Sequence, residues 1–247
     1  RQLGEAYDSF LFINNDVQAI RAGWLESMRD KLGQRQVGVI GAVLLYPPDS
    51  VSEKAGVARV TESPDRSQPQ IQHAGVHLGV GVAEHYLKTE PYQNAYLDGP
   101  SLNPAVPSPI TRSFSAVTAA CLLVRKELFA KLDGFSEDLA VGFQDVDFCL
   151  RAGNEGYKVL CDAEAVLFHH ESVSRTRGDF FDRDPHPQDT AEFLDRYLHD
   201  IGRDPFYHPM LSTSTTGYRP LRSINQSRLI QTRATNTGLE PFPMESD

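Results

Sequence analysis

The sequence has few cysteines, a deficit of positive charge and no long apolar run. Only three of its 247 residues are cysteine, and Cys121, Cys149 and Cys161 all lie beside apolar residues. An odd number without framework spacing predicts reduced, buried thiols, as in a cytosolic protein. The formal net charge of −9 argues against a broad nucleic-acid-binding face. No apolar run approaches the roughly 18 residues that a membrane span needs. No signal peptide is visible in the sequence, which opens with Arg1 and not with Met.

Strand and helix patterns alternate along the chain. Residues 10–13 and 37–45 are continuous apolar runs, typical of strands covered on both faces. We further expect helices over 17–32, over 125–134, from Phe143 to Gly156 and over 190–201; a hairpin over 71–87; strands over 114–124, 157–162 and 163–170; and long loops over 49–70 and 88–111. This order predicts an α/β fold with a mainly parallel sheet.

A polar triplet, Asn14, Asn15 and Asp16, follows the first apolar run without a break. Ligands of open α/β sheets bind at the carboxyl ends of strands. A carboxylate flanked by amides suits a hard divalent cation that bridges to phosphate oxygens. The alternative is a plain strand-to-helix turn in which Asp16 caps the following helix.

Two acidic residues, Asp145 and Asp147, lie near the predicted start of a helix. Two positions apart on a helix, they diverge by about 200° and cannot both face one ligand. Asp147 and Arg151 have the i, i+4 spacing of an ion pair. Asp145 is then available to face a pocket and to take a proton from a hydroxyl group. The alternative is that both are ordinary first-turn acids.

Histidines form two sets. His169 and His170 end an apolar run, so one can point inward to a metal while the other faces away. In the other set, His73, His77 and His85 fit no zinc pattern, and surface positions on a hairpin explain them.

Small residues open the strand expected over 114–124. Thr118, Ala119 and Ala120 would let a bulky ligand approach the backbone, or would equally let a helix pack tightly against the sheet. Downstream of His169 and His170, Arg175 could clamp a phosphate.

Taken together, "FLFINNDV", "VGVIGAVLLYP", "IQHAGVHLGVGVAEH" and above all residues 117–175 resemble a family 2 glycosyltransferase with the GT-A fold. The similarity is greatest to bacterial rhamnosyltransferase-like enzymes of surface polysaccharide and O-antigen synthesis. The "NND" motif resembles the family's Asp-x-Asp motif, and "QD" in "GFQDVD" resembles its Glu-Asp pair.

The resemblance implies a role for each matching residue. Asp145 is implied to be the general base. Asp16 and His169 are implied to bind Mg²⁺ or Mn²⁺, and His170 is the alternative to His169 as the histidine ligand. The donor and its diphosphate are implied to contact Asn14, Asn15, Ala119, Ala120, Ser174 and Arg175, and the acceptor to contact Thr118 and Gln144.

The implied reaction is an inverting transfer from a nucleotide-diphospho-sugar of the UDP or dTDP type to a glycan or lipid-linked acceptor. We expect a cytoplasmic protein, with peripheral association at the inner face of the plasma membrane if the acceptor is lipid-linked, and no nucleic-acid partner. Two other functions stay open: a non-catalytic carbohydrate-binding or assembly module, and a metal-dependent phosphoesterase using Asp16, Asp145 and His169.

The resemblance also divides the chain. Residues 1–178 correspond to the C-terminal part of a GT-A domain, 179–221 to a helical or irregular extension, and 222–247 to a polar tail expected to be disordered. The family's nucleotide-binding strands and helices have no counterpart before residue 10. We therefore expect an exposed sheet edge, low stability and weak donor binding for this chain alone.

Overall fold

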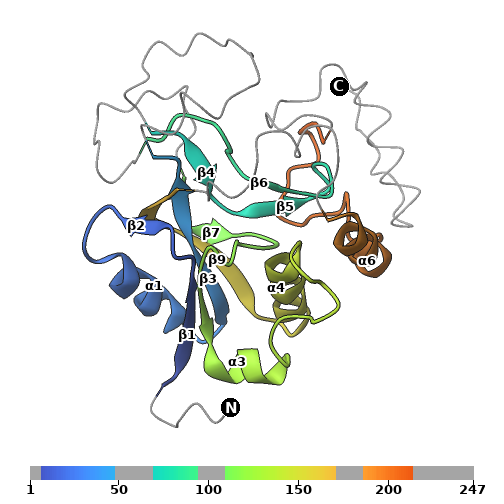
Figure 1. The fold of residues 1–247 in the computed structure, drawn as a ribbon, viewed down its shortest axis with the longest axis horizontal. Helices are drawn as coiled ribbons and strands as arrows, with labels where there is room; N and C mark the ends of the chain where they lie inside the picture. Colours follow the sequence, from blue (N-terminus) through green and yellow to red (C-terminus); the bar gives the residue numbers. More distant parts are fainter. Residues whose placement is uncertain (1–6, 48–68, 94–108, 171–185, 214–247) are drawn as a thin grey trace, which may run out of the picture.

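A central sheet with helices on both faces organises the chain (Figure 1). The computed structural model describes residues 7–47, 69–93, 109–170 and 186–213. The strands are β1 (Ser9–Ile13), β2 (Val17–Ala19), β3 (Val37–Leu45), β4 (Ile71–His73), β5 (Val76–Leu78), β6 (Ala83–His85), β7 (Arg112–Ser113), β8 (Cys121–Arg125) and β9 (Lys158–His169). The helices are α1 (Trp24–Leu32), α3 (Lys126–Lys131), α4 (Gln144–Asn154) and α6 (Pro187–Tyr197).

The α/β class agrees with the structure, but the strand directions differ from the prediction. The main sheet has the order β1-β8-β3-β9-β2, with β4 added to β3 and β7 added to β9. Among the strand pairs that the structure describes, only β3 and β9 run parallel. A mainly parallel sheet was therefore the wrong prediction. The prediction was based on the alternation of strand and helix patterns along the chain, and this alternation does not fix the direction in which distant strands pair.

The two longest strands form the buried centre of the sheet. Every residue of β3 is buried, as the apolar run over 37–45 predicts. Residues 158–169, expected as two strands, form the single strand β9. Its pairing with β3 shifts register between Ala42 and Val43, so an irregularity within one strand produced the apparent break in the sequence pattern.

The helix predicted over 17–32 begins later. Val17–Ala19 forms β2, which pairs antiparallel with β9, and α1 starts only at Trp24. Gly23 precedes the helix with φ of 86°, a left-handed conformation that glycine adopts without steric cost. No side-chain hydrogen bond caps α1, so the alternative role of Asp16 as a helix cap is wrong. At the other end, the expected C-cap Gly33 donates its N–H to the Arg29 carbonyl oxygen.

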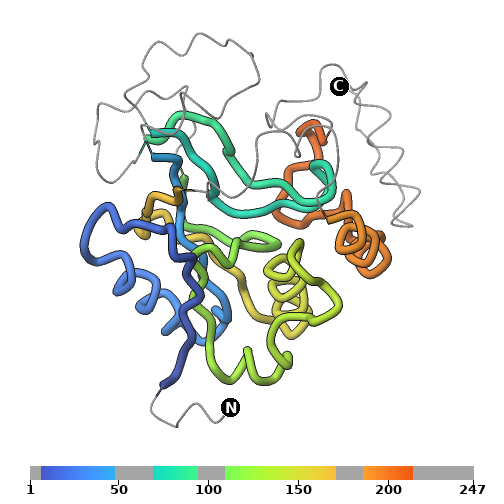
Figure 2. The backbone as a smooth tube through the Cα atoms, in the orientation of Figure 1, coloured from blue at the N-terminus to red at the C-terminus, as the bar shows by residue number. Residues whose placement is uncertain are grey.

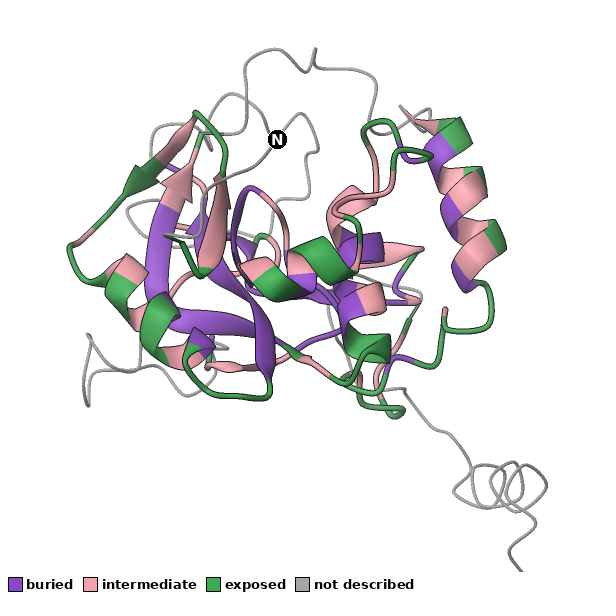
Figure 3. Ribbon diagram, turned by 90° about the horizontal axis from the view of Figure 1, so that it is seen from below, coloured by how far each residue is buried: buried purple, intermediate pink, exposed green. Residues whose placement is uncertain are grey.

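Strand β1 is less buried than its sequence suggests. Its residues are partly buried and Ile13 is exposed, in contrast to β3 (Figure 3). Within the described residues β1 pairs only with β8, which makes it an edge strand. Phe10 and Phe12 pack on Phe129 of α3 with ring centroids 5.5 and 5.2 Å apart. The exposed sheet edge predicted from the sequence is therefore present, while full burial of β1 was a wrong prediction.

Each face of the sheet has its own core. Met28 and Leu32 of α1 pack with one set of β3 and β9 side chains. On the opposite face, Leu128 of α3 and Phe148 of α4 pack with the other set. Because every second residue of a strand faces the same side, the continuous apolar sequence of β3 supplies both cores.

A small hairpin and the last helix cover the remaining side of the molecule. Strands β5 and β6 pair as a hairpin, which is shorter than the one predicted over 71–87, because residues 71–73 form β4 and pair with β3 instead. The segment after α6 lies beside this hairpin, and α6 lies beside α4 (Figure 2). The strand expected over 114–124 is shorter than predicted, because β8 begins at Cys121. The helix expected over 190–201 is shifted, because α6 spans Pro187–Tyr197.

Cys121, Cys149 and Cys161 are free and buried, as predicted. None of the helices that the structure describes is long and apolar enough to cross a membrane. The proposed division at residue 178 falls outside the described residues, as does the tail over 222–247.

Candidate active site

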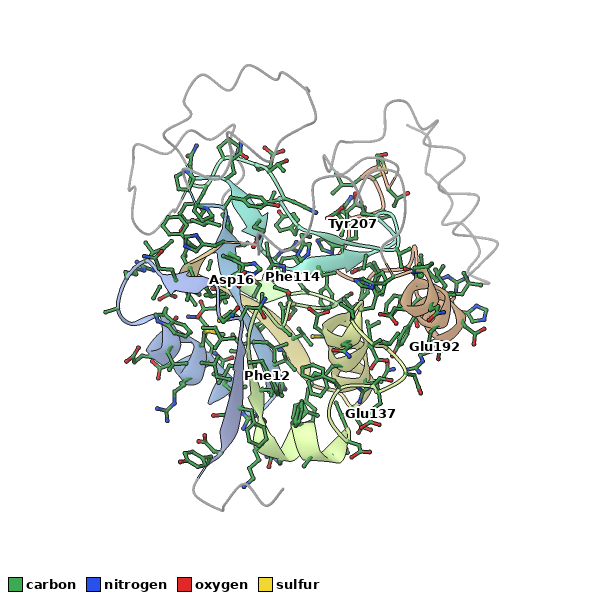
Figure 4. The ribbon with its side chains drawn as sticks, in the orientation of Figure 1. Phe12, Asp16, Phe114, Glu137, Glu192 and Tyr207 are labelled. Carbon is green, nitrogen blue, oxygen red and sulfur yellow. The ribbon has the colours of Figure 1, made fainter. Side chains whose placement is uncertain are left out.

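The first part of the candidate site is the turn after β1. The backbone N–H of Asn14 donates to the Ala120 carbonyl oxygen over 3.0 Å, which joins the end of β1 to the start of β8. The Val17 N–H donates to the Asn14 carbonyl oxygen, and the chain then enters β2. Because Val17 pairs with His169, this turn places Asp16 beside the end of β9 (Figure 4).

Asp16 and His169 meet at that point, as the sequence predicts. Nε2 of His169 lies 3.2 Å from Oδ1 of Asp16 and 3.3 Å from Nδ2 of Asn14. Both the histidine and the carboxylate are largely shielded from solvent, with side-chain exposures of 12% and 18%. His170 instead contacts the Gln18 Oε1 atom over 3.1 Å, so it points to the other side of β9. The structure therefore favours His169 over His170 as the inward-facing histidine.

Gln72 of β4 orients the His169 ring. Its Oε1 atom lies 2.6 Å from Nδ1 of His169, and the residue is only 7% exposed. When Nδ1–H donates to this oxygen, the Nε2 lone pair points toward Asp16 and Asn14. This is the arrangement by which proteins prepare a histidine for metal binding.

Two further histidines lie behind this group. The Nδ1 atoms of His73 and His85 are 2.7 Å apart, and the Thr118 N–H points to Nε2 of His73 over 3.5 Å. Burial holds the pKa of His73 well below its ordinary value and lowers the pKa of His85 to about 3. The pair is therefore neutral near pH 7, with Nδ1–H of His73 as the donor to His85.

The burial of these histidines contradicts their assignment to the surface. His73 and His77 are 0% and 1% exposed, and His85 is partly buried. Nδ1 of His77 lies 3.5 Å from the Asp204 carboxylate. The sequence carried little signal for this, because β4 has only three residues and Ile71 is the one apolar residue among them, although all three are buried. Buried polar groups of this kind require partners.

Asp145 contacts the segment just before β8. It lies in the first turn of α4, where the helix dipole stabilises a carboxylate. Its Oδ2 atom accepts the Ala119 N–H over 2.9 Å, and Oδ1 accepts the Val146 N–H over 2.9 Å. Asp147 points away, as its spacing predicts, and its Oδ2 atom accepts a hydrogen bond from Nε of Arg151 over 2.8 Å.

Residues 118–120 connect the two acidic groups. Ala120 accepts the N–H of Asn14, near Asp16, and Ala119 donates its N–H to Asp145. Asp16, His169 and Asp145, which are distant in sequence, are thus linked through one short segment with small side chains. Thr118 uses its hydroxyl to accept the Ala120 N–H over 3.3 Å, which stabilises the segment itself.

Four of the residues predicted to contact the donor or the acceptor are not placed at the centre of this group or are not described by the structure. The Gln144 amide donates to the carbonyl oxygens of Leu139 and Ala140, so this end of the side chain is directed to the preceding loop. Asn15 is exposed in the turn after β1. Ser174 and Arg175 lie outside the described residues.

The side chains fit a divalent cation in type and spacing. Oxygen and nitrogen ligands about 2.1 Å from one ion, at right angles, lie roughly 3 Å apart, and the Asp16–His169 distance of 3.2 Å matches this. In the described part of the chain no group of three or more His, Cys, Asp or Glu side chains is arranged to hold a metal. Any cation here would therefore need further oxygens from an amide, water or substrate.

Comparison with known proteins gives relatives over most of the chain. No family model matches it. It is 32% identical over 207 residues to "O-antigen biosynthesis protein RfbC" of Myxococcus xanthus, and 33% identical over 205 residues to "Uncharacterized protein y4gI" of Sinorhizobium fredii. These matches cover 83% and 81% of this chain but only 14% and 19% of the relatives.

A third relative has a more specific name. The chain is 26% identical over 188 residues to "N-acetylglucosaminyl-diphospho-decaprenol L-rhamnosyltransferase" of Mycobacterium tuberculosis, covering 76% of this chain and 55% of that protein. The named relatives together suggest a family of glycosyltransferases. Because the chain spans only part of each relative, their complete activities do not transfer to it directly.

Proposed function

We propose that this chain forms the diphosphate-binding and acceptor-activating part of an inverting glycosyltransferase of the GT-A, family 2 type, acting in cell-surface polysaccharide synthesis. The observation that carries the proposal is the link between the Asp16–His169 pair and Asp145 through residues 118–120. The names of two relatives support the same reaction class.

The base is Asp145. Its two oxygens accept backbone N–H groups from Ala119 and Val146, which fix the orientation of the carboxylate. A carboxylate held in this way can take the proton of an acceptor hydroxyl as that oxygen attacks the anomeric carbon of the donor sugar. The bond from the anomeric carbon to the diphosphate breaks, the nucleoside diphosphate leaves with the electron pair, and the configuration inverts.

The donor is a nucleotide-diphospho-sugar of the UDP or dTDP type. Asp16, His169 and the Asn14 amide would hold Mg²⁺ or Mn²⁺, which supplies positive charge against the departing diphosphate. Asn15, Ala119 and Ala120 would contact the donor, together with Ser174 and Arg175. The small side chains of residues 119 and 120 let a sugar approach the backbone between the two acidic groups.

The acceptor is a glycan or a lipid-linked sugar. Thr118, next to Ala119 in the chain, and Gln144, next to Asp145, would contact it, while the Gln144 nitrogen donates to the loop before α4. A lipid-linked acceptor, as named for the mycobacterial relative, would bring the protein to the inner face of the plasma membrane as a peripheral protein.

The test is sugar transfer by the full-length product of the gene that encodes this chain. UDP- and dTDP-linked sugars, including dTDP-rhamnose, are incubated with Mg²⁺ or Mn²⁺ and a lipid-diphospho-N-acetylglucosamine acceptor. We expect glycosylated lipid from the wild type and a rate about 10²–10⁴-fold lower for Asp145→Asn. Asp195→Asn, on the exposed side of α6, is the matched control and should retain the rate.

Other outcomes distinguish the alternatives. Glycan binding without transfer by any of these proteins would identify a non-catalytic carbohydrate-binding module. Release of inorganic phosphate from simple phosphate esters, dependent on Asp16, would identify a phosphoesterase. Either result would overturn the proposed transfer reaction.

A further inference from the structure

The loop that leads into α4 is held by a carboxylate from a different element. Asp189, in the first turn of α6, accepts the backbone N–H groups of Ala140, Val141 and Gly142 over 3.0, 2.8 and 2.6 Å. These hydrogen bonds lower the pKa of the Asp189 carboxyl group, which keeps it ionised at neutral pH. Asp189 is only 5% exposed, so it is part of the packed structure.

The next residue of the loop has an unusual backbone. Phe143 precedes α4 with φ of 61°, a left-handed conformation that side-chain-bearing residues rarely adopt. Its ring stacks on Phe193 of α6, with the centroids 4.6 Å apart and the planes at 17°. A conformation of this kind costs on the order of 1 kcal/mol and persists only where surrounding contacts enforce it. Here the contacts on both sides of the turn come from α6.

The same helix also holds α4 beyond Asp145. The hydroxyl of Tyr197 donates to Oδ1 of Asp147 over 2.8 Å, and Nη1 of Arg196 lies 3.3 Å from the same oxygen. Thus α6 contacts the chain just before and just after Asp145, although α6 itself makes none of the hydrogen bonds to Asp145 that the structure shows. Glu192 marks the position of α6 beside α4 (Figure 4).

We infer that Asp189 is a positioning residue that aims the Asp145 carboxylate at the Ala119 N–H and the acceptor hydroxyl, by fixing residues 140–143 in the turn that starts α4. This rests on the proposed function, in which Asp145 is the base. Without the Asp189 carboxylate, three backbone N–H groups lose their acceptor and the turn at Phe143 loses one of its two supports. A shift of about 1 Å in a reacting group is enough to lower a rate about 100-fold.

The experiment compares Asp189→Ala and the milder Asp189→Asn with Asp195→Asn, a matched control on the same helix. One readout is the nuclear magnetic resonance signal of the Ala119 amide proton in the full-length protein, which reports the hydrogen bond to Asp145 without any substrate. Asp145→Asn serves as the reference for a weakened bond. We expect an upfield shift of this signal in both Asp189 variants and none in the control.

The second readout is kinetic. With dTDP-rhamnose or whichever donor the wild type uses, kcat should fall about 10–100-fold in Asp189→Ala and less in Asp189→Asn, while KM for the donor stays within about twofold. Thermal unfolding of each variant is recorded beside these values. If Asp189→Ala does not fold, the values for Asp189→Asn test whether Asp189 positions Asp145.

An unchanged Ala119 signal and an unchanged kcat in folded Asp189 variants would overturn the inference and leave the proposed function intact. A parallel loss of kcat and donor affinity, with no movement of the Ala119 signal, would show a general structural role and would also overturn it. If the wild type transfers no sugar but the Ala119 signal moves, Asp189 does position Asp145 and the proposed reaction is wrong.

Discussion

Nε2 of His169 lies 3.2 Å from the Asp16 carboxylate, while Nδ1 of the same ring lies 2.6 Å from the amide oxygen of Gln72. The ring is therefore fixed from one side and presents its other nitrogen to an acidic group. Loss of the amide would free the ring to rotate and to change its tautomer.

Gln72→Leu should weaken Mn²⁺ binding about 10–100-fold, because the partner that orients a metal-binding histidine contributes affinity of that size. The measurement is Mn²⁺ titration followed by electron paramagnetic resonance, with no substrate present. Gln18→Leu is the matched control, since Gln18 contacts the neighbouring His170 instead. Equal Mn²⁺ affinity in both variants would contradict the role assigned to Gln72.

Asp147→Asn should lower the free energy of unfolding by about 3–5 kcal/mol, the usual cost of breaking a buried ion pair. Asp147 is 0% exposed and its oxygens contact Arg151, Arg196 and Tyr197. Urea unfolding measures the change. Asp138→Asn removes a partner of Arg196 that is 74% exposed, so its effect should stay below about 1 kcal/mol. Similar losses in the two variants would show that the burial of Asp147 contributes nothing.

Gly41→Ala should destabilise the protein by about 1–3 kcal/mol, because an added methyl group overpacks the core. A Cβ atom at Gly41 would lie 2.5 Å from Cβ of Val117, directly before the segment 118–120. In contrast, Gly153→Ala adds a methyl group with no atom within 4 Å apart from the adjoining residues and backbone of its own helix, and should stabilise α4 by roughly 0.5–1 kcal/mol. Chemical unfolding of both variants tests this difference, and an equal response would be unexpected.

Acid should destabilise the protein through His85. Burial, with repulsion from Lys88 and His169, lowers the pKa of His85 to about 3. The unfolded chain takes up a proton near the ordinary pKa of about 6.5, whereas the folded chain does so only near 3. The free energy of unfolding therefore falls as pH drops from about 6.5 toward 3.

His85→Gln should reduce this dependence, which urea unfolding at pH 7 and pH 5 measures. His199→Gln replaces an exposed histidine and should leave the dependence close to that of the wild type. If the His85 variant and the wild type lose the same stability between the two pH values, the assigned protonation is wrong.

Helices and strands with a long, clear hydrophobic pattern were predictable from the sequence. The apolar run of Val37–Leu45 has the same bounds as β3, and the spacing after Phe143 predicted α4 closely. Val17–Ala19 was misassigned because three residues are too few for either period to be distinguished, and pairing with β9 decided their conformation. Strand direction failed for a different reason, since it depends on how distant segments are connected.

In the candidate site, too, some residues could be predicted from the local sequence and others depend on contacts between distant segments. Asp16, Asp145 and His169 could be selected because acidic residues and histidines stood at element ends, and the structure links them. Gln72 and Asp189 could not be selected, because their importance lies in a contact with one atom of a distant residue. The histidines of the hairpin region were misplaced because burial depends on which segments cover them.

One consequence follows from the position of β1 at the sheet edge. Edge strands fray more readily than central ones, because fewer hydrogen bonds must open. Asn14 and Asp16 follow β1 directly, and in the described residues this strand has β8 as its single neighbour. Asn14 and Asp16, the cation ligands proposed above, therefore follow an edge strand, so any contact that stabilises β1 should also strengthen the proposed binding of the diphosphate.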